Sequence, residues 1–293
     1  GHVPFLWVLL FYFMTGLWIW KKNGQNRHIR ISLAYVIMII LIWIPMARRK
    51  SLAFLDVGQG DCFVADTKSG AIIFDGGSSS EDQVGRYRIL PYMKYLGYQK
   101  IQIAVISHMD IDHYSGIKEL LEMGKIKYLG LPEIPKDETM KKIIGIAKKR
   151  GTTIFYLSRG RQITTKDGSL KVLHPQKNSQ MEKNAASLVM QGKILGYRVL
   201  LTGDVEKEGE EELLSEELER ADILKAAHHG SKNSTSNEFL QKVQPKQTVI
   251  SCGKQNRYGH PHLETIHRLQ TYRTKIYRTD RSGAIIFFKR RDG

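Results

Sequence analysis

The chain has 293 residues, of which 42% are hydrophobic, so it is long enough to bury one large core or two smaller ones. Its formal net charge of +16 at pH 7 suits a polyanionic partner, although many soluble proteins are mildly basic without binding nucleic acid. The two cysteines, Cys62 and Cys252, form no CxxC pair. Composition therefore argues against a thiolate zinc site and leaves the class of partner open.

Residues 1–50 differ in composition from the rest of the chain. They hold two apolar runs without a charged residue, 3–20 and 31–47, and they contain seven Lys or Arg and no Asp or Glu. As helices these runs would reach about 25–27 Å, just short of a typical hydrocarbon core. A cleaved signal sequence and a buried hairpin are the alternatives, but the charges of a signal sequence precede its apolar run, whereas here they follow it. We expect a transmembrane helical hairpin at 1–50.

After residue 50 the pattern changes to short strands, glycine turns and amphipathic helices. Strands are expected at 51–57, 62–66, 71–74, 101–107, 170–173, 187–190, 198–202, 248–251 and 284–288. Helices are expected at 89–96, 115–123, 139–149 and 205–220. Strands that alternate with helices predict a layered α/β domain over residues 51–293.

Four side chains that can bind metal lie within six residues, directly after the predicted strand at 101–107. The motif is His108-Met109-Asp110-Ile111-Asp112-His113. A loop at this point could turn His108 and Asp110 toward one ion, and Asp112 and His113 toward a neighbouring ion. Because such a density of ligand-type residues is hard to explain by packing, the motif indicates a metal site rather than a solvated polar loop.

Two later segments add ligand-type residues. Asp204 follows an apolar strand and Gly203, and one carboxylate can bridge two cations about 3.5–4 Å apart. An ordinary aspartate at a strand end is the alternative. His228 and His229 then precede a tight turn at Gly230. One of these imidazoles is a plausible ligand, and the other could orient it or contact the substrate.

Three weaker signals surround this set. Asp56, Asp61 and Asp75 lie at glycine-rich strand ends, where they could brace the ligands by hydrogen bonds or simply form turns. His260 lies in a basic loop and could contact a substrate phosphate. Two further histidines, His262 and His267, are expected at the surface, and His174 is expected to be structural.

Several segments resemble the metallo-β-lactamase superfamily and, within it, the C-terminal domain of the ComEC family of DNA-internalisation competence proteins. In chain order they are FLDVGQGDCFV, IIFDGG, VISHMDIDHYSG, NAASLVM, VLLTGD, ILKAAHHGSKNSTS, VISCGKQNRYGHPH and YRTDRSGAI. The resemblance implies a four-layer αββα fold, preceded by two transmembrane helices that look like the last spans of a ComEC channel. The rest of that channel and an OB-like domain have no counterpart in this sequence.

The resemblance also implies two divalent metal ions and no small organic cofactor. The first ion would be held by His108 and Asp110, the second by Asp112, His113 and His228, with Asp204 bridging them. The superfamily's further histidine has no match at residues 184–187, so Asn184, water or substrate would take its place. Since Asp110 replaces an imidazole with a hard oxygen donor, Mn²⁺ is favoured and Zn²⁺ stays possible.

These features together predict a metal-dependent phosphodiesterase, a DNA nuclease that acts beside a membrane during DNA uptake. The expected catalytic residues are Asp112, His228 and His260. The expected substrate-binding residues are Ser231, Lys232, Asn184, Arg257 and His260. The alternatives are a hydrolase of a small ester or lactam, and a non-catalytic module of a DNA-transport complex. Expected partners are single- or double-stranded DNA, the cell membrane, and either a channel subunit or the ComEC channel domain that this sequence lacks. The hydrolase domain is expected on the extracytoplasmic side.

Overall fold

The computed structural model describes residues 5–20, 32–37, 39, 49–181, 184–216 and 218–290. The chain divides into two compact units, residues 1–48 and 49–293. In the first unit, helix α1 spans Phe5–Trp20, and the ring of Phe11 lies 5.5 Å from that of Tyr35. The second predicted apolar run, 31–47, falls largely outside the described residues. Among the helices that the structure describes, none combines the length and the apolar character needed to cross a membrane.

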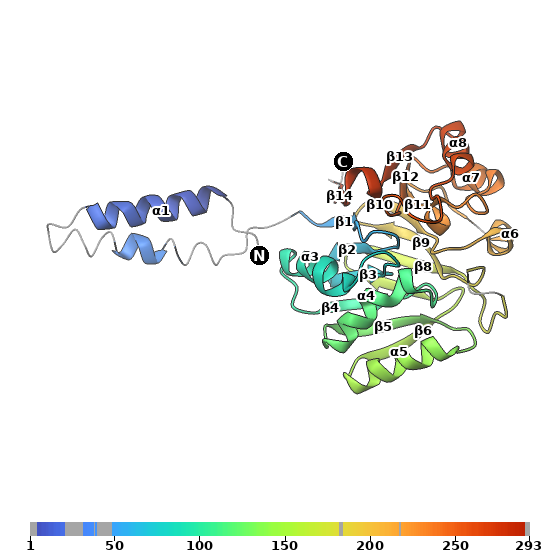
Figure 1. Ribbon diagram of the computed structural model, residues 1–293, viewed down its shortest axis with the longest axis horizontal. Helices are drawn as coiled ribbons and strands as arrows, with labels where there is room; N and C mark the ends of the chain where they lie inside the picture. Colours follow the sequence, from blue (N-terminus) through green and yellow to red (C-terminus); the bar gives the residue numbers. More distant parts are fainter. Residues whose placement is uncertain are drawn as a thin grey trace. The chain divides into compact units, whose positions relative to one another are not determined.

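The second unit contains two seven-stranded sheets (Figure 1). The first sheet has the order β14-β1-β2-β3-β4-β5-β6, and its members are β1 (Ser51–Phe54), β2 (Phe63–Thr67), β3 (Gly70–Phe74), β4 (Ile101–Val105), β5 (Ile126–Pro132), β6 (Thr153–Leu157) and β14 (Ile285–Phe288). From β14 to β3 neighbouring strands are antiparallel, and from β3 to β6 they are parallel.

The second sheet repeats this arrangement of antiparallel and parallel strands. Its order is β13-β12-β11-β10-β9-β8-β7, and its members are β7 (Gln162–Thr165), β8 (Gly168–His174), β9 (Val189–Ile194), β10 (Tyr197–Leu201), β11 (Ile223–Lys225), β12 (Gln247–Ile250) and β13 (Lys275–Arg278). Strands β7 to β10 pair antiparallel, and β10 to β13 pair parallel.

Helices follow the strands of both sheets. Those that follow strands of the first sheet are η1 (Gly85–Ile89), α3 (Leu90–Tyr95), α4 (Ile111–Glu122) and α5 (Glu138–Lys149). Those that follow strands of the second sheet are α6 (Lys207–Ser215), η2 (Ala227–Gly230), α7 (Asn237–Val243), α8 (Leu263–Thr271) and α9 (Thr279–Ser282). Local caps help to set their starts: Asp137 accepts a hydrogen bond from Met140 N at the start of α5, and Ser236 accepts one from Phe239 N at the start of α7.

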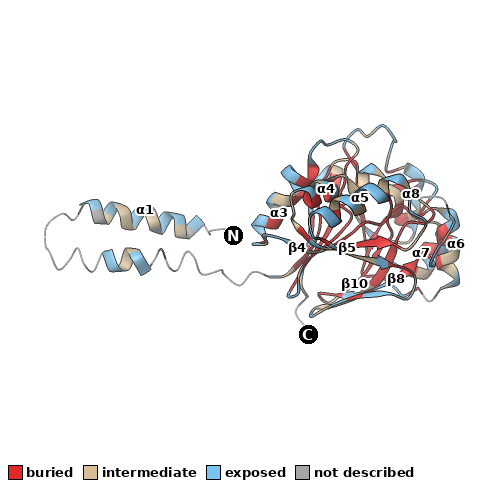
Figure 2. Cartoon of the chain, turned by 90° about the horizontal axis from the view of Figure 1, so that it is seen from below, coloured by how far each residue is buried: buried red, intermediate tan, exposed pale blue. Residues whose placement is uncertain are grey.

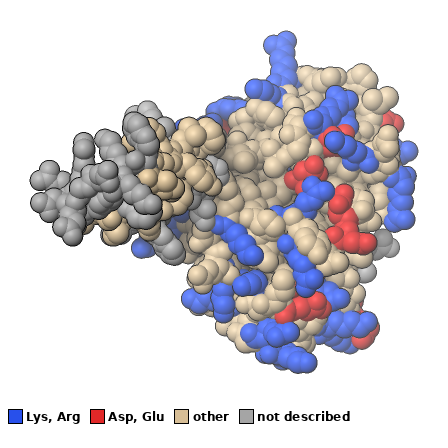
Figure 3. All heavy atoms as spheres, turned by 60° about the vertical axis from the view of Figure 1, so that its left-hand side comes forward, with Lys and Arg blue, Asp and Glu red and all other residues tan. Residues whose placement is uncertain are grey.

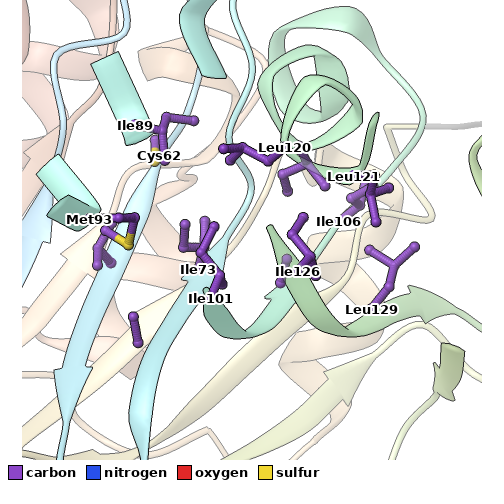
Figure 4. Packing of buried hydrophobic residues seen from close by; sticks show 14 of the residues in the cluster. Cys62, Ile73, Ile89, Met93, Ile101, Ile106, Leu120, Leu121, Ile126 and Leu129 are labelled. Carbon is purple, nitrogen blue, oxygen red and sulfur yellow. The ribbon is translucent and has the colours of Figure 1, made fainter. Parts of the chain in front are cut away.

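Three buried clusters separate four layers. The side chains of β3 alternate between two of them, because successive residues of a strand point to opposite faces. Ile73 packs with Ile117 and Met93 in the cluster under the first set of helices, part of which Figure 4 shows. Phe74 packs in the cluster between the sheets, and Phe239 in the cluster beneath the second set of helices. The buried residues form the interior of this unit in Figure 2. The predicted αββα arrangement with two sheets is confirmed.

Candidate metal centre

The predicted ligands lie at one edge of the two sheets. His108 follows β4, Asp204 follows β10, and the two consecutive histidines follow β11. These strands belong to the parallel halves of their sheets, so their carboxyl ends meet at a common edge. Asp112 and His113 lie in the first turn of α4. The expectation that they belong to a loop is therefore wrong, since the helix begins at Ile111 and fixes both side chains against the sheet edge.

Four buried residues form the closest group of ligand-type side chains in the described part of the chain. They are Asp61, His113, Asp204 and His229, with one ligand atom from each lying within 4.8 Å of the others. Asp204 is central, since its Oδ2 lies 3.1 Å from His113 Nε2 and 3.4 Å from His229 Nε2. Asp112 is adjacent, with its Oδ2 3.4 Å from His229 Nε2.

Three imidazoles of this region, those of His108, His113 and His229, are held by their Nδ1 atoms. His113 Nδ1 lies 3.0 Å from Asp75 Oδ2, His229 Nδ1 lies 2.9 Å from the carbonyl of Ser251, and His108 Nδ1 lies 3.0 Å from Ser107 Oγ. The Nε2 atoms of all three rings are buried and have no hydrogen-bond partner. Buried polar atoms are rarely left unpaired. Histidines that bind metal show this arrangement, with one nitrogen anchored and the other directed at the ion, so the residues present fit a divalent metal.

The charges of the cluster also suit a cation. Burial alone would raise the pKa of Asp204, but the imidazoles of His113 and His229 and the ammonium of Lys225 hold it well below its usual range. Burial alone would lower the pKa of His113, but Asp204 and Asp75 raise it well above its usual range. The carboxylate is thus ionised, as a metal ligand must be. A divalent ion bound here would take the place of the imidazole protons.

The two consecutive histidines occupy different positions. His228 and His229 both have left-handed backbone angles, with φ of 46° and 53°. Such angles cost about 1–3 kcal/mol in a residue with a side chain, and they are concentrated at functional sites. The geometry places His229 in the four-residue cluster. His228, the predicted ligand, points its Nδ1 to Glu206 Oε1 at 2.8 Å and has its Nε2 3.8 Å from Asp204 Oδ2.

The first predicted metal position lies beside this cluster. His108 Nε2 is 3.7 Å from Asp110 Oδ2. In the segment where the superfamily carries a further histidine, the side chain near His108 is that of Ser187, whose Oγ lies 3.2 Å from His108 Nδ1. Asn184 instead lines a neighbouring cavity of about 1320 Å³, together with Asp110 and Lys232.

A smaller cavity of about 240 Å³ opens onto the cluster. Its lining is formed by Gln59, Asp110, Ile111, Asp112, Asp204, His228, His229, Tyr258 and His260. Burial and the neighbouring His229 and His228 lower the pKa of His260 to about 4, so its imidazole is neutral at pH 7. Arg257 donates a hydrogen bond to the hydroxyl of Tyr258 at 2.7 Å, and the ring of Tyr258 stacks on His260 with centroids 5.7 Å apart. Ser231 is buried, and its hydroxyl accepts from Asn233 N at 3.3 Å.

Sequence reasoning missed two charged residues of the site. Lys225 ends β11 with its ammonium against Asp61 and 3.5 Å from Asp204 Oδ1. Glu206 holds His228. One feature of the sequence could have identified Lys225: it is a single charged residue at the end of an apolar segment, three residues before His228. A lysine at that position ordinarily indicates a solvated strand end.

Comparison with known proteins identifies the superfamily of this domain. Residues 55–254 match the family model of the metallo-beta-lactamase superfamily. The chain belongs to the metallo-beta-lactamase superfamily. Among solved structures it is similar to the metallo-beta-lactamase fold protein YhfI from Bacillus subtilis (13% identity, TM-score 0.55, 80% of this chain and 99% of that one) and to CmlA, a diiron beta-hydroxylase from Streptomyces venezuelae (10% identity, TM-score 0.53, 94% and 59%). These likenesses show the fold alone.

Curated relatives within the superfamily carry competence names. The chain is 35% identical to ComE operon protein 3 of Bacillus subtilis, over 93% of this chain and 38% of that protein. It is 30% identical to Competence protein ComA of Neisseria gonorrhoeae, over 81% of this chain and 32% of that protein. The predicted membership of the ComEC family is confirmed, and the chain spans about a third of the length of these relatives. The superfamily fold and the buried His/Asp cluster support a metal-dependent hydrolase.

Proposed function

We propose that this domain is a metal-dependent phosphodiesterase that cleaves DNA during DNA uptake. The observation that carries the proposal is the set of three buried imidazoles, His108, His113 and His229, whose Nε2 atoms make no hydrogen bond. One of them, His229, lines an open cavity together with Asp112 and Asp204. The competence names of the relatives favour DNA over a small ester or lactam. Lys and Arg side chains are also spread over the face of the molecule in Figure 3, as suits a polyanion.

Divalent ions bound at this centre would lower the pKa of a water toward neutrality and offset charge on the phosphate oxygens. The residues of the chain supply the remaining functions. Asp75 keeps the proton of His113 on Nδ1, which leaves Nε2 as the ligand atom. Asp112 and Asp204 add carboxylate oxygens beside His229. These side chains are anchored at the sheet edge before any substrate arrives, so little reorganisation precedes the reaction.

Substrate contacts would come from the open side of the cavity. His260 is half-buried, and its imidazole is neutral at pH 7. A neutral imidazole can donate a hydrogen bond to a phosphate oxygen, and it carries no positive charge that would pair with the carboxylates of the metal centre. Arg257 is exposed beside it and restrained by Tyr258, which suits contact with the next phosphate. Lys232 and Asn184, which line the larger cavity, would contact the strand farther from the metal centre. Ser231 is buried and would support the loop that carries Lys232.

We further propose that Mn²⁺ supports more activity than Zn²⁺. Asp110 and Asp204 provide oxygen donors at the first position, and oxygen donors favour Mn²⁺ relative to an all-histidine site. Metal-stripped protein should regain more DNase activity with Mn²⁺, and Asp110→His should shift the preference toward Zn²⁺. Higher wild-type activity with Zn²⁺ would contradict this argument.

The decisive experiment measures cleavage and metal content together. The 293-residue chain is stripped of metal, reloaded, and incubated with labelled single- and double-stranded oligonucleotides and, separately, with a chromogenic ester. We expect metal-dependent cleavage of DNA, its loss in Asp112→Ala and His113→Ala, and no turnover of the ester. Turnover of the ester alone would support the small-substrate alternative. Bound metal without turnover of either substrate would support a non-catalytic transport module.

We also propose that residues 1–50 form a membrane hairpin with a cytoplasmic loop, and that the hydrolase domain faces outward, where incoming DNA would meet it. The basic flanks of the two apolar runs are nearly balanced, so the positive-inside rule barely decides the orientation. Protease added to intact cells should cut the domain. A protected domain would reverse the orientation. Crosslinking in cells would test the proposed contact with a channel subunit.

A further inference from the structure

Lys225 is a buried cation at the metal centre. It is 4% exposed, and its Nζ donates a hydrogen bond to the carbonyl of Gly203 at 2.9 Å. The same ammonium contacts Asp61 Oδ2 and lies 3.5 Å from Asp204 Oδ1. A buried ammonium costs several kcal/mol unless it is paired. Its position between two carboxylates therefore calls for a function.

The two oxygens of Asp204 have different surroundings. Oδ1 faces Lys225, while Oδ2 lies 3.1 Å from His113 Nε2 and 3.4 Å from His229 Nε2. These are the imidazole nitrogens without hydrogen-bond partners. Lys225 thus forms an ion pair with Oδ1, which makes no hydrogen bond, and Oδ2 is directed toward the metal side of the rings.

Asp61 approaches the same rings from behind. Its Oδ2 lies 3.7 Å from His113 Nδ1, and its Oδ1 lies 3.5 Å from His229 Nδ1. Both contacts are to the nitrogen opposite Nε2, so Asp61 is on the anchored side of the imidazoles. Its closest charged neighbour is Lys225. Although Asp61 belongs to the group of four ligand-type residues, this geometry is that of a counter-ion.

We propose that Lys225 is a positioning residue, paired with Asp61 as an internal salt bridge, which orients Asp204 so that a single oxygen faces the metal ions. The inference rests on the proposed metal centre and removes Asp61 from its ligands. If Asp61 and Lys225 act as a pair, the affinity for metal depends on the balance between their charges. Loss of Asp61 leaves an uncompensated cation beside the site, whereas loss of both charges restores the balance.

A charge cycle tests this with the full 293-residue chain in detergent. Binding of Mn²⁺ is measured by calorimetry and metal content for wild type, Asp61→Asn, Lys225→Met and the double variant. We expect Asp61→Asn to bind Mn²⁺ at least tenfold more weakly. We expect Lys225→Met to bind it at least tenfold more tightly but with a lower kcat, since Asp204 is no longer oriented. The double variant should bind within about threefold of wild type.

The visible absorption of bound Co²⁺ decides between a counter-ion and a ligand, because it reports on the groups that coordinate the ion. If Asp61 is a counter-ion, Asp61→Asn binds metal more weakly but keeps the wild-type spectrum; a changed spectrum means that Asp61 is a ligand and overturns the inference. Should Lys225→Met fail to fold without metal, the comparison of Asp61→Asn with wild type still decides the question. Asp66→Asn is the matched control, because Asp66 is a buried carboxylate at the far end of β2 that pairs with Lys50 and Tyr98. A wild-type chain that binds no divalent ion would refute the metal centre itself.

Discussion

Asp75→Asn should weaken metal binding without reshaping the site. Asp75 Oδ1 accepts a hydrogen bond from Ser107 N at 2.7 Å, and its Oδ2 lies 3.0 Å from His113 Nδ1. An asparagine that keeps the first bond turns its NH₂ group toward His113. The Nδ1 atom must then accept rather than donate, which moves the ring proton to Nε2 and removes that atom as a ligand.

The expected loss of metal affinity follows from the hydrogen bond between Asp75 and His113. Partners that orient a metal-binding histidine typically contribute about 10–100-fold in affinity, which corresponds to about 1.4–2.7 kcal/mol. If the amide flips instead, its NH₂ group meets Ser107 N, and one buried donor is left without an acceptor. Either arrangement lowers the free energy of unfolding by about 1–3 kcal/mol. We therefore expect a large loss of metal affinity together with a moderate loss of stability.

Calorimetric titration of metal-stripped protein with Mn²⁺ measures the first quantity, and thermal unfolding with EDTA measures the second. Asp66→Asn is again the matched control, because it removes the charge of another buried carboxylate in the same sheet. That variant should lose stability and bind Mn²⁺ as wild type does. Equal affinities of Asp75→Asn and wild type would refute the proposed orientation of His113.

Three further predictions concern the surrounding fold. A Cβ at Gly77 would lie 2.5 Å from Ile111 O, so Gly77→Ala should displace the start of α4 and weaken Mn²⁺ binding. The control is Gly145→Ala, at a helix position with open space around it, which should raise the free energy of unfolding by up to about 1 kcal/mol and leave Mn²⁺ binding unchanged. Burial lowers the pKa of His174, so below about pH 6.5 the unfolded chain binds a proton that the folded chain does not. The free energy of unfolding should therefore fall as the pH drops below this value, by up to about 1.4 kcal/mol per pH unit. Urea unfolding of His174→Gln should show a smaller dependence on pH. Phe239→Ala should lower the free energy of unfolding by about 3–5 kcal/mol, and a loss under 1 kcal/mol would contradict its core position.

The sequence alone determined the ligand motif and the fold class, because both depend on short segments of the chain. Residues 108–113 combine ligand types at a spacing that few other functions require, and the ordered motifs pointed to the αββα fold. Strands β5, β6, β7, β11 and β13 were not predicted. Several of them mix charged and apolar residues, as in Lys127 and Tyr128 of β5, so their local propensity is weak. Their pairing depends instead on neighbouring strands of the sheet, which no short window of sequence contains.

Only the tertiary structure decided which groups meet at the metal centre. Neighbours in the chain, such as His228 and His229, have the same chemistry, and left-handed backbone angles set by the surrounding fold direct one ring into the cluster and the other toward Glu206. From the sequence, Lys225 would be assigned to the solvated end of a strand. It becomes a buried cation because the two sheets bring Asp61, from the start of the domain, against β11. Side-chain chemistry is local and can be read from sequence, whereas burial and charge pairing arise from contacts between distant segments.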